Sequence, residues 1–208
     1  MTGGERPLVA VLDYGIGNLR SAQKALEVGG ADARLTADAV LVRSADAVVL
    51  PGVGAFGACM QALRGVGLET VVHDAVGSGR PFLGICVGMQ MLFDASEEDP
   101  GEAGLGVIAG RVRWITDALP RPQMQWNQLS PTRDDPMFAG LGDHPWMYFV
   151  HSLHGVPDDP SVVAATCDYG GTVNAAFRLG SVFATQFHPE KSGGHGLAML
   201  RNFVEAVR

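Results

Sequence analysis

Short apolar runs alternate with amphipathic stretches along the first half of the chain, and this alternation limits the fold more than any other feature. Three runs have the length and apolar character of buried strands: residues 8–12, 47–50 and 82–85. Apolar side chains recur at helical spacing over residues 18–28 and 68–76, and residues 88–93 are expected to begin a further helix. A repeated strand–helix order predicts a parallel sheet with helices on both faces.

The second half of the chain has a different pattern, in which strand-like runs are linked by turns rich in Pro, Gly and Asp. Some of these strands are expected to be antiparallel, and they span residues 111–115, 146–150, 161–166, 172–178 and 182–187. A last helix is expected over residues 194–207. No internal repeat or linker interrupts the 208 residues. The sequence therefore predicts one α/β domain over residues 1–208, built on a mostly parallel twisted sheet, with residues 1–6 as a loose tail.

Composition excludes several classes of function. A net charge of −7 and a pI near 5.2 argue against a nucleic-acid-binding surface. No apolar run approaches the length of a transmembrane span, and the first residues lack the pattern of a secretion signal. The three cysteines are too few and too widely spaced for a disulfide framework. These features are typical of a cytoplasmic globular protein that binds neither nucleic acid nor membrane.

Cys86 stands in the stretch GICVGMQ, between an expected strand and an expected helix. Gly84 and Gly88 flank it two residues away on each side, which is the pattern of a nucleophile elbow with Cys in place of Ser. Such a turn exposes the thiol, aims a helix N-terminus at it and points the N–H of Val87 towards a developing oxyanion. A buried structural thiol is the alternative, because Cys is among the most often buried residues.

A thiolate nucleophile needs a base, and the chain has six histidines. His188 directly follows an expected strand, and Glu190 stands two residues further on, so both side chains would project to one side of an extended backbone, about 7 Å apart at Cα. Pro189 restricts its own φ and the conformation of His188. A carboxylate in this place can hold the imidazole in one tautomer. Cys86, His188 and Glu190 are therefore the candidate catalytic triad.

A dinucleotide site and a metal site are both disfavoured. In GIGN, residues 15–18, Arg20 stands where a dinucleotide-binding fingerprint requires a third glycine. A tight turn with Asn18 as the cap of the following helix is the better interpretation. His151 and His154 have no accompanying Cys or carboxylate at metal-binding spacing. We expect neither a metal nor a cofactor.

A second glycine-rich turn, PGVG, follows the strand expected at residues 47–50. Its Gly52 and Val53 could present backbone N–H groups as the second half of an oxyanion hole. An ordinary turn is the alternative, and the stretch taken alone favours it.

These stretches together resemble the class I, or triad, glutamine amidotransferases. GICVGMQ and the downstream ATQFHPEKSG carry the resemblance, and it extends over nearly the whole chain through DYGIGNLRS, LPGVGAF, MQWNQL and YFVHS. Within this family the chain is similar to the glutaminase subunits of imidazole glycerol phosphate synthase. Relatives in other pathways typically have His at the position of Met89 and a residue other than Lys at the position of Lys191.

The resemblance implies a mechanism. Cys86 would attack the side-chain amide of L-glutamine to form a glutamyl thioester, while His188, oriented by Glu190, moves the protons. Val87 and the Gly52–Val53 peptide would supply the oxyanion donors, and the partner would trigger a rearrangement of that peptide. The residues implied to line the glutamine site are Gln90, Ser152, Leu153 and Glu98.

The resemblance also implies a partner. Ammonia reacts only while unprotonated, so it would pass directly to a cyclase subunit built as a (β/α)₈ barrel, which forms a heterodimer with the chain in histidine biosynthesis. The candidates for the docking face are Asn18, Trp126, Tyr148 and Lys191. The alternatives are a helix cap for Asn18, core positions for the two aromatic residues and a solvated charge for Lys191.

Two positions depart from the family. Relatives usually have Gly at the position of Gln125 and often an aromatic residue at the position of Leu153, so the contacts with glutamine or with the partner would differ. Other functions stay open as alternatives. They are a glutaminase of another pathway, such as pyridoxal phosphate synthesis, a γ-glutamyl hydrolase or peptidase that needs no partner, and a non-catalytic binding module of the same fold.

Overall fold

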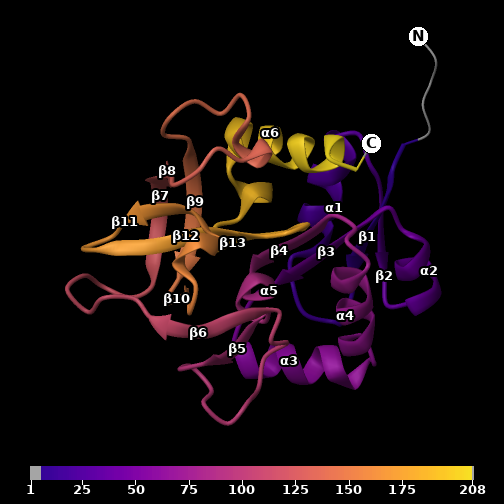
Figure 1. Ribbon diagram of the computed structural model, residues 1–208, viewed down its shortest axis with the longest axis horizontal. Helices are drawn as coiled ribbons and strands as arrows, with labels where there is room; N and C mark the ends of the chain where they lie inside the picture. The colour runs from indigo at the N-terminus through magenta and orange to yellow at the C-terminus, as the bar shows by residue number, and fades with distance from the viewer. Residues whose placement is uncertain (1–5, 208) are drawn as a thin grey trace.

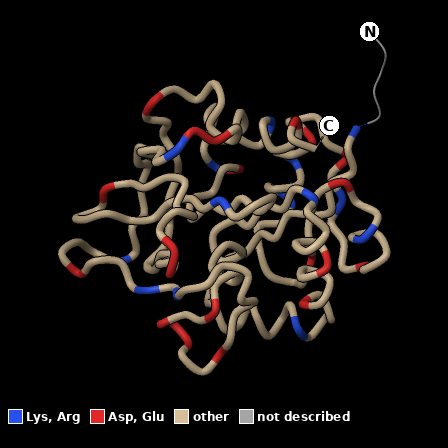
Figure 2. Tube along the Cα trace, in the orientation of Figure 1, with Lys and Arg blue, Asp and Glu red and all other residues tan. Residues whose placement is uncertain are grey.

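An eight-stranded sheet runs through the protein in the strand order β2-β1-β3-β4-β13-β12-β11-β8 (Figure 1). The computed structural model describes residues 6–207, so residues 1–5 of the expected tail lie outside the described part. A three-stranded sheet, β10-β6-β5, and a two-stranded ribbon, β7-β9, accompany the large sheet. Acidic and basic residues are distributed over the whole view of the molecule (Figure 2).

The first half of the chain forms the parallel part of the large sheet. β1 (Leu8–Leu12) pairs in parallel with β2 (Asp32–Thr36) and with β3 (Ala47–Gly52), and β3 pairs in parallel with β4 (Phe82–Cys86). The side chains of β3 and β4 are buried throughout, as expected for strands covered on both faces. The α/β class and the parallel sheet predicted from the apolar runs are confirmed.

Helices connect the parallel strands and cover the sheet. They are α1 (Leu19–Val28), α2 (Ala39–Ser44), α3 (Phe56–Gly65), α4 (Glu69–Gly77) and, at the end of the chain, α6 (Gly193–Glu205). α1 and α6 lie on one side of the sheet, and α3 and α4 lie on the other (Figure 1). The sequence predicted α1, α4 and α6 but not β2, α2 or α3. The residues of α3 that are buried at helical spacing are Phe56, Cys59, Met60 and Leu63. The glycine-rich turn PGVG just before α3 obscured this pattern in the sequence.

The second half of the chain adds the antiparallel strands, as expected. β13 (Val182–Thr185) pairs in parallel with β4, and the sheet continues antiparallel through β12 (Thr172–Leu179), β11 (Val163–Asp168) and β8 (Ser130–Pro131). The other strands are β5 (Phe93–Ser96), β6 (Ile108–Trp114), β7 (Gln123–Gln128), β9 (Trp146–His151) and β10 (Leu153–Pro157). Three short 3₁₀ helices, η1 (Pro136–Phe138), η2 (Pro160–Val162) and η3 (Pro189–Lys191), complete the elements found within residues 6–207.

The helix expected to begin over residues 88–93 is shorter than predicted. α5 (Val87–Gln90) is a single turn, and Phe93 already begins β5. The carbonyl of Met91 accepts a hydrogen bond from the N–H of Leu105, and the carbonyl of Leu92 accepts from Ile108. These bonds to a returning segment replace the bonds that would continue the helix.

The carboxyl ends of three parallel strands meet at one edge of the large sheet. Gly52 at the end of β3 is the register partner of Cys86 at the end of β4, and Ile85 is the partner of Thr185 at the end of β13. Ligands of open α/β sheets bind at such an edge. Over residues 6–207, no helix combines the length and the apolar character that crossing a membrane requires.

Candidate active site

Cys86 ends β4 in a strained backbone conformation. Its φ of 55° and ψ of −113° make it the one non-glycine residue with positive φ among residues 6–207. Such a conformation costs about 1–3 kcal/mol and is typical of functional sites. A Cβ atom at Gly88 would collide with the carbonyl oxygen of Leu50, and one at Gly84 would lie 3.0 Å from the Cα of Met89. The sharp turn predicted from the two flanking glycines is confirmed.

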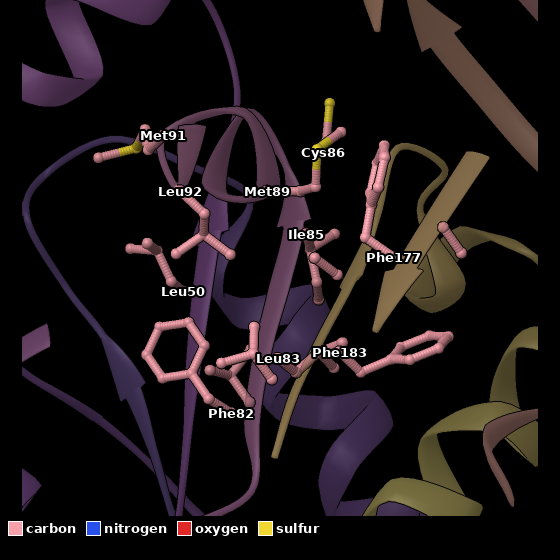
Figure 3. Close-up of a cluster of buried hydrophobic side chains, with 14 of the residues drawn as sticks. Leu50, Phe82, Leu83, Ile85, Cys86, Met89, Met91, Leu92, Phe177 and Phe183 are labelled. Atoms are coloured by element: carbon pink, nitrogen blue, oxygen red, sulfur yellow. The ribbon is translucent and has the colours of Figure 1, made fainter. Parts of the chain in front are cut away.

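The Cys86 thiol lies at the upper end of a cluster of buried apolar side chains and points away from Leu83 and Phe82 (Figure 3). It faces a cavity of ≈ 330 Å³ beyond the carboxyl edge of the sheet. The four residues expected to bind glutamine, Gln90, Glu98, Ser152 and Leu153, line the same cavity, and so do Val53 and Val87 of the expected oxyanion hole. The thiol is therefore accessible from a cavity, in contrast to a structural cysteine enclosed by the core.

His188 follows β13 and lines the cavity beside Cys86. Its Nδ1 is 2.8 Å from Oε1 of Glu190, and both side chains are almost fully buried. The N–H of His188 donates to the carbonyl of Tyr148 at 3.0 Å, and the Ser192 hydroxyl donates to the carbonyl of His188 at 2.6 Å. Strand β9 and the start of α6 thus fix the backbone that carries the imidazole.

The pKa of His188 is raised to about 9. Burial by itself lowers this pKa, but hydrogen bonds to Cys86 and Glu190, together with the attraction of their charges, outweigh burial. Because Glu190 occupies Nδ1, Nε2 is the ring nitrogen left for Cys86. The imidazole is therefore placed to carry a proton between a thiol and a ligand, with a carboxylate behind it.

The expected oxyanion residues lie at different depths. Val53 and Val87 line the cavity, whereas Gly52 is buried behind it as the register partner of Cys86. The oxyanion role expected of the Gly52–Val53 peptide stays a prediction. Gly52 allows the close approach of α5 to β3, since a Cβ atom there would lie 2.5 Å from the N of Gly88.

Hydrogen bonds hold both carbonyl groups that flank the Gly52–Val53 peptide. The Tyr14 hydroxyl donates to the carbonyl of Pro51 at 2.6 Å, and the Cys59 thiol donates to the carbonyl of Val53 at 3.3 Å. Burial raises the pKa of Tyr14, so its hydroxyl keeps its proton. Tyr14 and Cys59 therefore hold the Gly52–Val53 peptide in place from the side opposite the cavity.

The residues expected to bind glutamine surround the cavity. The amide nitrogen of Gln90 donates to the carbonyl of Leu153 at 3.3 Å and to Oε1 of Gln186 at 3.1 Å, which leaves the Gln90 oxygen to accept from a ligand. Oε2 of Glu98 accepts from the N–H of Phe56 at 2.8 Å. This carboxylate therefore both lines the cavity and holds the start of α3.

A family model described as glutamine amidotransferase class-I matches residues 11–207. The chain belongs to the class-I glutamine amidotransferase family. Curated proteins named imidazole glycerol phosphate synthase subunit HisH resemble this amidotransferase over nearly its full length. One from a Synechococcus strain is 52% identical and covers 96% of the chain and 93% of its own length. The relative from Syntrophotalea carbinolica is 50% identical, covering 94% of this chain and 98% of its own.

Solved structures share the fold of this amidotransferase at lower identity. PurLQS from Thermotoga maritima has a TM-score of 0.77 at 20% identity, covering 98% of this chain and 100% of that chain. A protein described as a glutamine amidotransferase has a TM-score of 0.76 at 23% identity, covering 96% of this chain and 98% of that chain. These likenesses confirm the predicted fold class.

Three buried polar residues that support the amidotransferase site were not predicted: Gln186, His151 and Ser192. Nδ1 of His151 lies 2.7 Å from the carbonyl oxygen of Leu153, and Nε2 lies 2.9 Å from Oε1 of Gln123. Burial lowers the pKa of His151 to about 4, so the ring is neutral and its single N–H donates to one of these two oxygens. A polar residue inside an apolar strand-end stretch, as in YFVHS and ATQFHP, is the signal that could have indicated His151 and Gln186.

The four docking candidates lie on elements around the cavity. Trp126 on β7 is 47% exposed, and its ring stacks edge-on against half-buried Tyr148 on β9 at a centroid distance of 6.1 Å. The core alternative is therefore wrong for Trp126. Lys191 lines the cavity and is half-buried. Asn18 is exposed and occupies the N-cap position of α1, as expected. Its side chain accepts a hydrogen bond from the Ser21 hydroxyl and from no backbone N–H, so the prediction that the Asn18 side chain caps the helix is wrong.

Of the two positions expected to depart from the family, Gln125 is exposed on β7 next to Trp126, whereas Leu153 is buried and lines the cavity. Within residues 6–207, no group of three or more His, Cys, Asp or Glu side chains is placed to hold a metal ion. The side chains that line this cavity include the thiol of Cys86, the imidazole of His188, the amide of Gln90, the carboxylate of Glu98 and the ammonium group of Lys191.

Proposed function

We propose that this chain is the glutaminase subunit of imidazole glycerol phosphate synthase, which hydrolyses L-glutamine and delivers ammonia to a cyclase subunit in histidine biosynthesis. One observation carries the proposal. Cys86, His188 and Glu190 come together at a cavity in a chain about half identical to HisH subunits over nearly its full length. Three free, buried cysteines fit a cytoplasmic enzyme.

In the first half of the reaction, the Cys86 thiolate attacks the side-chain amide carbon of glutamine, and the carbonyl electron pair moves to the oxygen. Backbone N–H groups of Val87 and Val53 stabilise that oxyanion. The tetrahedral intermediate collapses as His188 gives its proton to the amide nitrogen. The C–N bond breaks, ammonia leaves, and the glutamyl group stays bound to Cys86 as a thioester.

In the second half, water attacks the thioester while neutral His188 takes one of its protons. The intermediate then expels the Cys86 thiolate beside the imidazolium of His188, and glutamate leaves. Glu190 keeps Nδ1 of the ring occupied, so Nε2 carries the proton in both halves. Side chains and backbone groups supply all of this chemistry, and no cofactor takes part.

The ammonia must reach the second active site without meeting bulk water, where it would be protonated. A cyclase barrel that covers the cavity to form a heterodimer would meet this requirement. Exposed Asn18 and Trp126, together with Tyr148 and Lys191, are the residues that we place in this interface. Lys191 supports the placement because it lies at the cavity itself.

The test is the Cys86→Ala variant in complex with a cyclase subunit. Glutamine-dependent synthesis should fall by roughly a thousandfold or more, because the nucleophile is lost. Synthesis from added ammonia should persist. Cys167→Ala, which removes a buried thiol away from the cavity, is the matched control and should keep both activities.

Three outcomes would contradict the proposal. Glutamine hydrolysis retained by Cys86→Ala would rule out the thioester mechanism. Strong hydrolysis of γ-glutamyl peptides without a partner would assign the chain to the hydrolases of this fold. If the unaltered chain with a cyclase subunit hydrolysed no glutamine, a non-catalytic binding module would replace the enzyme.

A further inference from the structure

Gln186 lies behind the nucleophile in a place that the mechanism above does not use. It stands between β13 and His188, its side chain is fully buried, and its backbone N–H donates to the carbonyl of Ala175 on β12 at 2.9 Å. Nε2 of Gln186 is 3.9 Å from Sγ of Cys86, within reach of an N–H···S hydrogen bond. A fully buried amide beside a reactive sulfur is costly to place unless its hydrogen bonds are made.

The orientation of this amide follows from its neighbours. Nε2 of Gln90 donates to the Gln186 oxygen at 3.1 Å and also to the carbonyl of Leu153 at 3.3 Å. Because a backbone carbonyl can only accept, the end of the Gln90 amide that faces Leu153 is its nitrogen. If the Gln186 amide were reversed, its N–H groups would face those of Gln90. The Gln186 oxygen therefore faces Gln90, and its N–H group faces Cys86.

We propose that Gln186 stabilises the Cys86 thiolate by donating its Nε2–H to the sulfur, and that it holds the sulfur aimed at the cavity. A hydrogen bond to a charged acceptor is stronger than one to a neutral thiol, so the donor favours the anionic form. The consequence for glutamine hydrolysis rests on the proposed function. The consequence for the reactivity of the thiol does not.

Other titratable groups also act on this sulfur, and the test has to separate them from Gln186. Those that face Cys86 across the cavity or from behind it are His188, His151, Lys191, Glu98, Cys59 and Tyr14. Of these, His188 is the cation in direct contact with the sulfur, and it loses its proton at alkaline pH. Gln186 does not titrate, so its donor stays in place over the whole pH range.

The experiment is the rate of alkylation of Cys86 by iodoacetamide as a function of pH, read from the Cys86 peptide by mass spectrometry so that Cys59 and Cys167 do not contribute. In Gln186→Met, which keeps the length of the side chain but has no N–H, the midpoint of the profile should move up by about one pH unit. The rate at neutral pH should fall up to about tenfold. Gln186→Glu keeps an acceptor for Gln90 and places a carboxylate by the sulfur, so its midpoint should move further up.

Asn202→Leu is the control. Asn202 is half-buried, and its amide nitrogen donates to the carbonyls of Met137 and Ala139, away from the cavity. This variant should leave the Cys86 profile unchanged. Midpoints for both Gln186 variants equal to that of the unaltered chain would overturn the proposal, and if Gln186→Met fails to fold by circular dichroism, Gln186→Glu alone decides.

The alkylation requires neither glutamine nor a partner. A chain that hydrolyses no glutamine but shows the shifted profiles would therefore reject the proposed function and keep this inference. A chain that hydrolyses glutamine but shows no shift would do the reverse.

Discussion

The Glu190 carboxylate has one hydrogen-bonded oxygen and one without a partner. Oε1 bonds His188, whereas Oε2 is buried and has no hydrogen-bond partner within the described part of the chain. A buried carboxylate with so few partners is costly unless a positive charge lies beside it. The imidazolium of His188 supplies that charge, so the pair is most stable while His188 is protonated.

We therefore expect the free energy of unfolding to fall as the pH rises from 6.5 to about 9. Below pH 6.5 the folded and unfolded chains both bind the proton of His188, and the contribution of the pair is fully present. Above that pH the unfolded chain releases the proton first, so stability decreases until the folded pKa of about 9 is passed. The loss amounts to about 3 kcal/mol at most, and urea unfolding over this pH range would measure it.

The variant that isolates the contribution of Glu190 is Glu190→Gln, which removes one of the two negative partners of His188 and should weaken the pH dependence, while Cys86 remains as the other partner. His73→Gln, at an exposed histidine of α4, is the control and should keep the dependence of the unaltered chain. An equal loss of stability with pH in Glu190→Gln and in the unaltered chain would show that the His188 pair does not cause it.

At the scale of elements, the site depends on how closely α5 approaches β3. Gly52 and Gly88 touch across this contact, and neither has room for a side chain. The contact sets the direction in which the N–H of Val87 points and the distance from α5 to the Gly52–Val53 peptide. A change of one atom here should therefore disturb both the sheet and the oxyanion donors.

Gly88→Ala tests this close contact. The added methyl group would collide with the carbonyl of Leu50, and relief requires a backbone shift, so we expect a loss of roughly 2–4 kcal/mol in unfolding free energy. Gly65→Ala, at the last residue of α3 where no atom lies within 4 Å of the added methyl group, is the control and should change stability by less than about 1 kcal/mol. Similar unfolding free energies for the two variants would contradict the role of the close contact.

The same elements explain how far the sequence predicts this protein. β3 and β4 are covered on both faces, so their residues form unbroken apolar runs that can be recognised without a structure. β7 was missed because its residues, QMQWNQ, lie mostly exposed on a two-stranded ribbon and show no apolar alternation. The cysteine, histidine and glutamate of the site follow local patterns, whereas the contact of Gln186 with Cys86 joins residues 100 positions apart and has no local signal.

At the scale of the whole molecule, two of the candidate docking residues, Trp126 and Tyr148, are connected to His188 through β9. Trp126 stacks on Tyr148, and the carbonyl of Tyr148 holds the N–H of His188. The N–H of Tyr148 in turn donates to the hydroxyl of Ser192, just before α6, at 2.9 Å. A partner seated on Trp126 and Tyr148 would therefore contact the strand that positions the imidazole.

Trp126→Ala tests this interface. A tryptophan that is 47% exposed contributes little to folding, so we expect the temperature of thermal unfolding to change only slightly. The affinity for the cyclase subunit should fall about thirtyfold or more if Trp126 is an anchor of the interface. Trp114→Ala, at a 44% exposed tryptophan on β6, is the matched control for the loss of surface aromatic area. Titration calorimetry with the cyclase subunit would compare the two. Equal affinities of the two variants would place the partner on another face. Because β9 links Trp126 to His188, Trp126→Ala should also lose most of the partner's stimulation of glutamine hydrolysis if Trp126 anchors the interface.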